Sequence, residues 1–435
     1  MSDTHSETVF YVADEMLPEQ AAPVSSKGPA AWIQHNLFSS FTNAILTILS
    51  VAFVVFLVWK YLPWFTNAVW DAESLSECRE KLAGEFGACF AIIAERGHQF
   101  LYGFYPTDQI WRLGVALVLF FAALVPILTE GRARRFVGLS LLYPVAAFWL
   151  IWGGSIWTIG AFLLGPVLGY VAYRLLAANV GAGVGLLVGA AVTLLWWFFG
   201  VEWLARELRI AFGFVGLRPV PSSQLGGALL AMIIGVSGIV LSFPLGVLLA
   251  LGRQSNLFIV KTLCVGFIEF IRGVPLITLL FVASTLLNYF LPPGVSFDLL
   301  LRVIILVTLF SAAYIAEVVR GGLASIPRGQ YEAAQSLGLP YWDSMRLIIL
   351  PQALKVAIPG LVGTFIGLFK DTTLVSIIGL FDILGIRQPI VSDQTWNGII
   401  WEPLVFAAVF FFICCFAMSR YAMYMERRLD TGHRS

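Results

Sequence analysis

The stretch EAAQSLGLPYWDSMRLIILP, Glu332 to Pro351, is the most informative part of this chain. It reads Glu-Ala-Ala, three residues, Gly338, nine residues, isoleucine, one residue and Leu-Pro. Pro327 prevents a preceding helix from continuing, and Pro340 blocks the continuation of a helix that starts after Pro327. The pattern therefore predicts one short helix, Gly329 to Leu337, within a loop; an ordinary helical hairpin is the alternative.

Each conspicuous residue of this stretch has an expected place. Gly338 should end the helix in the left-handed conformation, which glycine adopts readily, and a second short helix should begin at Trp342. Glu332 should lie in the first turn, where the helix dipole favours a carboxylate. Ala333 and Ala334 are small enough to sit in a groove. A compact helix held between two membrane spans can pass a partner's rigid-body movement into the membrane.

The composition indicates a membrane protein. Of the 435 residues, 59% are hydrophobic and 12% are charged, whereas a soluble protein carries about 25% charged residues. The net charge of +1 excludes the basic footprint of a nucleic-acid-binding protein. No phosphate-binding loop of the form G-x-x-x-x-G-K-[ST] occurs, so we do not expect the chain itself to hydrolyse ATP.

Ten apolar segments are long enough to cross a bilayer core of about 30 Å as helices. They form two sets of five. The first set comprises Phe41–Leu62, Ile110–Thr129, Phe136–Gly153, Ile156–Leu176 and Gly181–Gly200. The second set comprises Gln224–Leu251, Leu257–Leu291, Leu299–Gly322, Ala353–Phe369 and Trp401–Tyr424. We therefore expect an all-α integral membrane protein with about ten transmembrane helices.

Charge asymmetry predicts the orientation of these spans. The basic loop Gly131–Arg135, the residues Arg253 and Lys261, and the basic end Glu426–Arg428 should be cytoplasmic. The loop 63–109 holds seven acidic and three basic residues and should be periplasmic. Ten spans with a cytoplasmic N-terminus return the C-terminus to the cytoplasm, and they place the Glu-Ala-Ala loop on the same side.

The same features divide the chain into segments. Residues 201–212, VEWLARELRIAF, have apolar side chains at helical spacing and indicate an interfacial amphipathic helix on the outer leaflet; a plain linker is the equal alternative. The expected segments are a cytoplasmic tail 1–40, a five-helix extension 41–200 with the loop 63–109, an interfacial linker 201–223, a core 224–428 with a loop 325–351, and a cytoplasmic tail 429–435.

The Glu332 to Pro351 pattern resembles the cytoplasmic coupling loop of bacterial ABC importer permeases at every position. Three further stretches, Ile268–Phe281, Ser311–Ala334 and Leu368–Leu380, look like the polar amino-acid branch of these permeases, which serves histidine, glutamate, arginine and opines. The resemblance covers about 224–428, where it implies the five-helix permease core. The N-terminal extension is similar to that of the general L-amino-acid importer permeases.

This resemblance implies a bacterial inner-membrane permease subunit that moves L-amino acids of broad specificity from periplasm to cytoplasm by alternating access. A permease specialised for one polar amino acid or opine is the alternative. The implied partners are a periplasmic amino-acid-binding protein, a second permease copy or related chain, and a pair of ATP-binding subunits that would hold the ATP and Mg. No catalytic, metal or cofactor site is expected in this chain. The residues expected to couple to the ATPase are Glu332, Ala333, Ala334, Gly338, Leu350 and Pro351.

Charged residues within the core are candidates for the translocation path, because ionisable groups inside a membrane usually face a cavity or a partner. Glu269 and Arg272 are three residues apart, as are Glu317 and Arg320, so each pair shares a helix face. Simple internal ion pairs are the alternative. The polar island that contains Lys370, Asp371 and Thr372 follows a long apolar run and indicates a broken or re-entrant helix near the path, or else a periplasmic loop.

Cys78 and Cys89 lie in the loop 63–109, where an oxidising periplasm would let a disulfide persist. We expect them to be bonded, although two unpaired thiols are the alternative. One helix could not carry both residues, because eleven helical residues separate their Cα atoms by about 16 Å and a disulfide needs less than about 7 Å. A turn is therefore required between them, and Gly84 or Gly87 is its expected place.

Two other classes of membrane protein are alternatives. A stand-alone secondary transporter often shows inverted repeats, and the two halves of this chain show no convincing similarity. An integral-membrane enzyme needs a catalytic constellation, but the four histidines, His5, His35, His98 and His433, lie outside the expected spans. Transport that persists without any ATPase subunit would favour the secondary transporter.

Overall fold

Helices make up nearly all of the regular structure in this computed structural model, which describes residues 28–129, 136–286, 289 and 297–429. The helices of the first half are α1 (Pro29–Leu37), α2 (Phe41–Thr66), α3 (Leu75–Leu82), α4 (Ala91–Tyr102), α5 (Ile110–Leu128), α6 (Val137–Trp152), α7 (Ile156–Val180), α8 (Ala182–Leu195) and α9 (Val201–Phe212). Those of the second half are α10 (Gly227–Arg253), α11 (Phe258–Gly273), α12 (Leu276–Thr285), α14 (Leu299–Ala324), α15 (Arg328–Ser336), α16 (Tyr341–Ser344), α17 (Leu350–Asp371), α18 (Arg387–Val391) and α19 (Trp401–Leu429).

Short elements connect these helices. The 3-10 turns are η2 (Thr107–Gln109), η5 (Ser222–Gln224) and η7 (Thr372–Ile378), and the π-helical turns are η4 (Trp196–Gly200) and η6 (Met345–Ile349). The strands β1 (Gly154–Ser155) and β2 (Gly216–Leu217) pair antiparallel. Most of the expected N-terminal tail, the basic loop at 131–135 and the last residues, 430–435, lie outside the described residues.

The expected all-α membrane fold is confirmed. Eight helices in the described ranges are long and apolar enough to cross a membrane, and one bent pair brings the number to nine. The expected span Phe136–Gly153 is found as α6, an apolar helix of 16 residues that is shorter than the other spans.

The expected span Leu257–Leu291 is broken in the structure. Its two parts, α11 and α12, meet at an angle of 98°. Val274 and Pro275 between them adopt extended backbone, because proline cannot continue α11 and disfavours a helical residue before it. The last residues of the expected span lie partly outside the described ranges.

Two other helices run further than expected. From Tyr341 to Ile378 the chain forms one continuous helix of 38 residues, whereas we expected a short helix and a separate span. Residues 183–212 also form one helix of 30 residues, in which α9 continues α8 through the π-helical turn η4. The segment 201–212 is therefore helical and continues α8, and its position at the membrane interface stays a prediction. Arg209 pairs with Glu202 on it at 2.5 Å.

The chain divides into two compact units, and the first contains Met1–Val69 and Arg79–Ala88. Within it, Ser40 caps α2 by accepting a hydrogen bond from the Asn43 backbone N–H at 3.2 Å. None of the α2 residues is buried within the structure, and its apolar side chains have the composition of a lipid-facing span.

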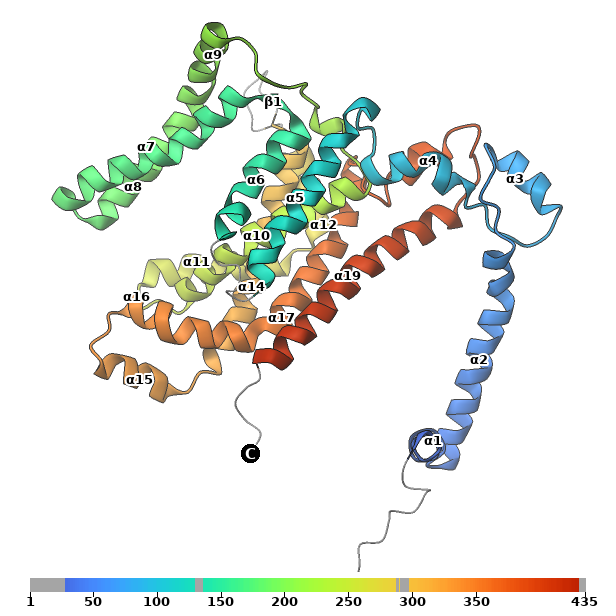
Figure 1. Cartoon of the computed structure of the whole chain (residues 1–435). Coiled ribbons are helices and arrows are strands. Elements are labelled where there is room, and N and C mark those ends of the chain that lie inside the picture. Colours follow the sequence, from blue (N-terminus) through green and yellow to red (C-terminus); the bar gives the residue numbers. More distant parts are fainter. Residues whose placement is uncertain (1–27, 130–135, 287–288, 290–296, 430–435) are drawn as a thin grey trace, which may run out of the picture. The chain divides into compact units, whose positions relative to one another are not determined.

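The second unit contains Trp70–Cys78 and Cys89–Ser435. At its centre α10 packs along α14, α14 packs along α17, and α17 packs along α19; Figure 1 shows these four helices beside one another. The backbones of α10 and α14 approach closely because Gly246 has no side chain. A Cβ at this position would clash with Ile315. Gly322 lies against Ala353, and Gly360 lies against Val318, so α14 and α17 run antiparallel.

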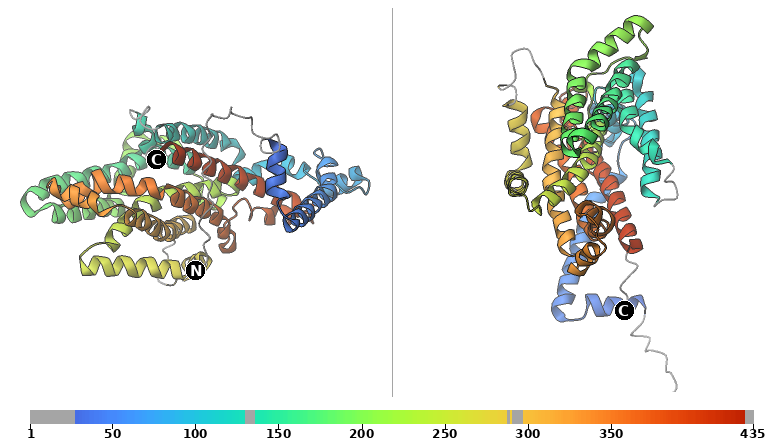
Figure 2. Two further views of the ribbon diagram at one scale, coloured as in Figure 1. Left: turned by 90° about the horizontal axis from the view of Figure 1, so that it is seen from below. Right: turned by 90° about the vertical axis from the view of Figure 1, so that its left-hand side faces the viewer.

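The helices α7 and α8 form a hairpin, which both views of Figure 2 show in green. Tryptophans on η4, which follows α8, attach this end of α8 to α7. Trp196 donates a hydrogen bond from Nε1 to the Ala161 carbonyl at 2.8 Å, and Trp197 stacks on Phe162 with ring centroids 4.7 Å apart. These aromatic groups lie towards the end of the hairpin that leads into α9.

The chain between η7 and α18 closes over the first residues of α10. The Gly227 N–H donates to the Phe381 carbonyl at 2.8 Å. The next residue, Asp382, is fully buried, and its Oδ1 accepts a hydrogen bond from the Gly385 N–H at 2.8 Å. Its other oxygen, Oδ2, is buried without a hydrogen-bond partner among the described residues. Burial raises the pKa of Asp382 to about 6, although the Gly385 N–H opposes the change.

Asp382→Asn should change the pH dependence of stability. Since the folded-state pKa is raised from 3.8 to about 6, the folded protein binds more protons than the unfolded chain between these values, and the wild type loses stability as pH rises through this window. Asparagine does not titrate, so the variant's melting temperature should gain on the wild type by roughly 2–4 °C from pH 4 to pH 7.

Thermal unfolding of the purified protein in detergent at several pH values measures this difference. Asp393→Asn is the control, because hydrogen bonds from the Thr395 N–H and hydroxyl lower the pKa of Asp393 below 3.8; its titration window lies below pH 4, so its offset from the wild type should be nearly constant from pH 4 to pH 7. A constant offset between wild type and Asp382→Asn at all pH values would contradict the prediction.

Candidate functional site

The short helix of the Glu-Ala-Ala stretch is present as α15, Arg328–Ser336, within a residue of the expected bounds. Gly338 follows it with φ of +71°. Its N–H donates to the Gln335 carbonyl at 2.9 Å, and the Leu339 N–H donates to the Ala334 carbonyl at 3.2 Å. These two bonds form a Schellman motif, which satisfies the last carbonyls of the helix. The helix end is therefore fixed by a glycine conformation that other residues avoid.

Glu332 does not lie in the first turn, because α15 begins at Arg328 and its first turn contains no acidic residue. The expected dipole interaction is therefore wrong. Glu332 and Ala333 are exposed, whereas Ala334 is fully buried. The two alanines, which we expected to act alike, thus have different roles: Ala334 packs the helix against its own chain, and Ala333 stays available on the surface.

Two polar contacts attach α15 to its neighbours. The Tyr331 hydroxyl donates to the Leu323 carbonyl of α14 at 3.4 Å, and Gln352 of α17 donates to the Gln330 side chain at 3.1 Å. The helix is therefore tied to the span before it and to the span after it. This is the connection that a movement of α15 needs in order to reach both spans.

The Leu-Pro at the end of the stretch begins α17. Leu350 is half-buried and Pro351 is exposed. Pro351 has no N–H to donate to the carbonyl four residues earlier, and the π-helical turn η6, Met345–Ile349, comes directly before α17. A π-helical turn is one way in which a helix accommodates such a gap.

Five charged side chains gather where α10, α11 and α14 meet, and we call them the charged cluster: Arg253, Glu269, Arg272, Glu317 and Arg320. Glu317, with 16% of its side chain exposed, pairs with three arginines. Its oxygens lie 2.7 Å from Arg253 Nη1, 3.7 Å from Arg272 Nη1 and 3.0 Å from Arg320 Nε. One carboxylate therefore holds the ends of three helices together.

The pairing within the charged cluster differs in part from the helix spacing. Glu317 and Arg320 pair as expected, but Glu269 pairs with Arg253 at 2.9 Å. Arg272 instead pairs with Glu317 and lies 5.6 Å from the centre of the Tyr314 ring. Sequence reasoning missed Arg253 as a site residue, since its place at the end of α10 suggested only an orientation signal.

The polar island is at the other end of the core from the charged cluster. The α-helical winding ends at Asp371 and the helix continues as the 3-10 turn η7 up to Ile378, so the polar island marks a change of helix type and not a re-entrant break. Thr372 is fully buried, and its hydroxyl donates to the Phe369 carbonyl at 2.7 Å. Because α14 and α17 are antiparallel, Lys370 and Asp371 lie near the end of α17 that is distant from Glu317, and the candidate path residues form two groups.

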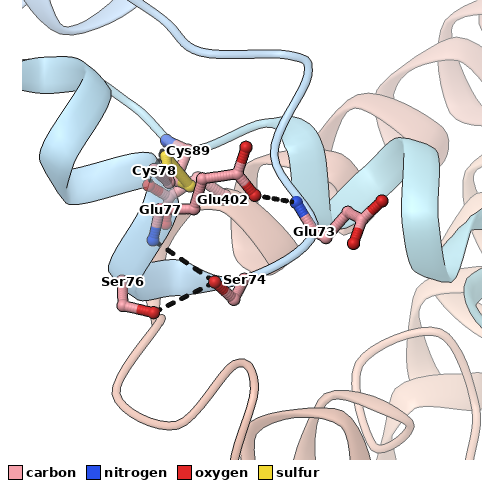
Figure 3. The surroundings of a disulfide bond; sticks show 7 residues. All are labelled: Glu73, Ser74, Ser76, Glu77, Cys78, Cys89 and Glu402. Atoms are coloured by element: carbon pink, nitrogen blue, oxygen red, sulfur yellow. Dashed lines mark hydrogen bonds between the residues drawn. A yellow bond between two sulfur atoms is a disulfide. The ribbon is translucent and has the colours of Figure 1, made fainter.

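Cys78 and Cys89 form a disulfide with a Cα–Cα distance of 6.1 Å. The turn between them is at Ala83 and Gly84, which both have positive φ, so Gly84 rather than Gly87 has the reversing conformation. Figure 3 shows the disulfide with Glu402 beside it. The Glu402 carboxylate, which is 7% exposed, accepts a hydrogen bond from the Cys89 N–H at 2.9 Å. Nothing in the sequence singled out Glu402.

Comparison with known proteins gives matches over the core and over the whole chain. Residues 242–431 match the family described as binding-protein-dependent transport system inner membrane component. The chain is 53% identical, over 100% of both chains, to the glutamate/glutamine/aspartate/asparagine transport system permease protein BztC of Rhodobacter capsulatus. It is 40% identical to the inner membrane amino-acid ABC transporter permease protein YhdY of Escherichia coli, over 95% of this chain and 97% of the relative.

Among solved structures, an amino acid ABC transporter crystallised with histidines matches 46% of this chain and 92% of its own chain. The sequence identity is 30% and the TM-score is 0.41.

Glu317→Gln should destabilise the protein more than Glu269→Gln. The first change removes the charge that three arginines share at a mostly buried position, at a cost of about 2 kcal/mol or more. The second removes one pair whose carboxylate is 54% exposed, at a cost below about 1 kcal/mol. Thermal unfolding of both variants in detergent gives the order, and equal melting temperatures would refute the central role of Glu317.

Proposed function

We propose that this chain imports acidic amino acids and their amides. The premise is that the chain belongs to the binding-protein-dependent transport system inner membrane components and is an amino-acid ABC transporter permease. The observation that carries the proposal is the full-length similarity to a permease named for glutamate, glutamine, aspartate and asparagine. Import from periplasm to cytoplasm by alternating access is part of the proposal.

The charged cluster supports an amino-acid substrate in general, and it does not by itself select the acidic class. It contains three guanidinium groups and two carboxylates, so one positive charge is left over within the part of the core that leads to α15. A surplus positive charge attracts carboxylate groups, which all four substrates carry. The cluster lies beside the span that precedes α15, where a substrate leaving towards the cytoplasm would pass.

The exposed side of α15 supports a partner of a particular kind. Glu332, Ala333 and Gly338 are exposed, and the helix is tied to both neighbouring spans. We infer that an ATP-binding subunit docks here, one of a pair, and that a second permease copy or a related chain supplies the other docking helix. A periplasmic amino-acid-binding protein would deliver substrate at the opposite end. ATP and Mg would be held by the partner, and this chain would contribute movement rather than catalysis.

Uptake into proteoliposomes tests the substrate class. The complete transporter, with its binding protein outside and ATP inside, should take up labelled glutamate. Unlabelled aspartate, glutamine and asparagine should compete, whereas leucine, histidine and arginine should not. Competition by all of these would favour the alternative of a broad-specificity L-amino-acid importer. Uptake without any ATP-binding subunit would refute the ABC assignment in favour of a secondary transporter.

Gly338→Val should abolish coupling while the protein remains inserted in the membrane. The φ of +71° at Gly338 costs a residue with a side chain about 1–2 kcal/mol or more, so the end of α15 should unwind or move. Gly329→Val is the matched control. Both glycines have open space around them, and Gly329 has no positive φ. Substrate-stimulated ATP hydrolysis in proteoliposomes is the measurement, and normal stimulation in Gly338→Val would end the hypothesis.

The proposed orientation predicts which residues can be labelled from outside. Position 77 should be periplasmic and position 335 cytoplasmic; a third useful position, Arg134, lies outside the described residues. Single cysteines at these places, in a background without the native cysteines, can be treated in intact cells with an impermeant maleimide. We expect labelling at 77 alone. Labelling of position 335 from outside would overturn the orientation.

A further inference from the structure

Residues 70–78 and 89–105 lie at one end of the core, within the same compact unit, and we call them the brace segment. They lie outside the range 242–431 that the family description covers. They nevertheless contact the core helices, since α4 packs against both α10 and α19. The part of the chain that the family does not share is thus built onto the part that it does.

One set of contacts reaches the loop that precedes α19. The Leu75 N–H donates to the Thr395 carbonyl at 2.9 Å, and Arg96 pairs with Asp393 at 2.6 Å. Arg96 also reaches the Thr395 hydroxyl at 3.5 Å. Because Arg96 and Asp393 are about one third exposed, their ion pair adds little stability by itself. Together the contacts fix the position of this loop at three atoms.

A second set of contacts reaches the first residues of α10. The Phe104 N–H donates to the Gln224 carbonyl at 3.1 Å, and Gly103 forms an isolated β-bridge with Leu225. The fully buried Phe100 packs on Phe406 of α19 with ring centroids 5.3 Å apart. The brace segment therefore holds α10 and α19 at the same end.

Glu402 is the centre of the attachment to α19. It lies in the first turn of this helix, where the helix dipole favours a carboxylate. Its buried carboxylate accepts the hydrogen bond from the Cys89 N–H, and the disulfide to Cys78 limits how far Cys89 can move. A hydrogen bond from a buried N–H to a carboxylate is among the stronger kinds in proteins. The disulfide thus links Cys78 of α3 to Cys89, and the hydrogen bond links Cys89 to Glu402 of α19.

We propose that the brace segment is a positioning element for the outer end of the permease core, and that Glu402 is the positioning residue through which it fixes the first turn of α19. The attachment is at the opposite end of α10 from the charged cluster, because α10 begins beside Gln224 and ends at Arg253. Twenty-seven helical residues span about 40 Å. The brace segment thus acts on the end that receives substrate, which rests on the proposed function, and leaves the coupling end untouched.

A first experiment tests the brace segment without any transport. The full-length protein in nanodiscs is compared by hydrogen–deuterium exchange with Glu402→Ala, Glu402→Gln and Cys78→Ser/Cys89→Ser. Glu402→Ala and the double variant should exchange faster than the wild type at residues 387–406. At residues 326–345 they should exchange at the same rate as the wild type. Glu402→Gln keeps an acceptor oxygen and should be intermediate. Glu73→Gln is the matched control, since its backbone N–H, not its side chain, makes the bond to Glu77. Equal exchange in all variants would overturn the proposal.

Mass spectrometry of the unreduced wild type checks the covalent part. After periplasmic exposure the two cysteines should be recovered as one cross-linked peptide. Recovery of both cysteines as alkylatable thiols would show that the disulfide is absent, and it would refute the proposed brace.

A second experiment separates positioning from a merely structural role. Glutamate uptake into proteoliposomes is measured while the binding protein is titrated. Glu402→Ala should raise the half-saturating concentration by roughly threefold or more with the maximal rate within about twofold, and Glu402→Gln should recover most of the loss. A lower maximal rate with unchanged half-saturation would overturn the positioning role. If the wild type carries no amino acid at all, the proposed function fails, and hydrogen exchange still decides the brace segment.

Discussion

A chain inside hydrocarbon must satisfy its own backbone hydrogen bonds, and the rest of this structure depends on that constraint. The long apolar segments are therefore regular helices, and the irregular backbone is limited to the connections between them. The main departures are the extended pair Val274 and Pro275, the glycine-terminated end of α15, and the chain on either side of α18 within 379–400. The helix α15 and the attachment of the brace segment are both in such places.

The sequence predicted most where local chemistry decides the outcome. Pro327, Gly338 and Pro340 determined α15 to within one residue, because proline and glycine limit the backbone whatever surrounds them. The disulfide turn was predicted by the same kind of argument, although Gly84 rather than Gly87 has the positive φ. Long apolar runs gave the spans, but they could not show that η4 and η6 let two helices continue, since a π-helical turn leaves no mark in composition.

The sequence predicted least where the partner is distant along the chain. Helix spacing indicated that Glu269 would face Arg272, and tertiary packing gave Glu269 to Arg253 instead. Glu402 had no signal at all, because its partner is a backbone N–H 313 residues away. Spacing reports which residues share a face of one helix, and it says nothing about which helix lies opposite. The candidate path residues were separable into two groups only after α14 and α17 were known to be antiparallel.

The continuous helix from Tyr341 to Ile378 connects the two ends of the core. Its 38 residues measure about 57 Å, nearly twice the thickness of a bilayer core of about 30 Å. A tilt of one degree at the end beside α15 displaces the far end by about 1 Å. Asp382, buried four residues beyond that end, lies on the loop that covers the start of α10. If α15 is moved by a partner, as proposed above, this one helix is the direct route from α15 to the loop at the other face.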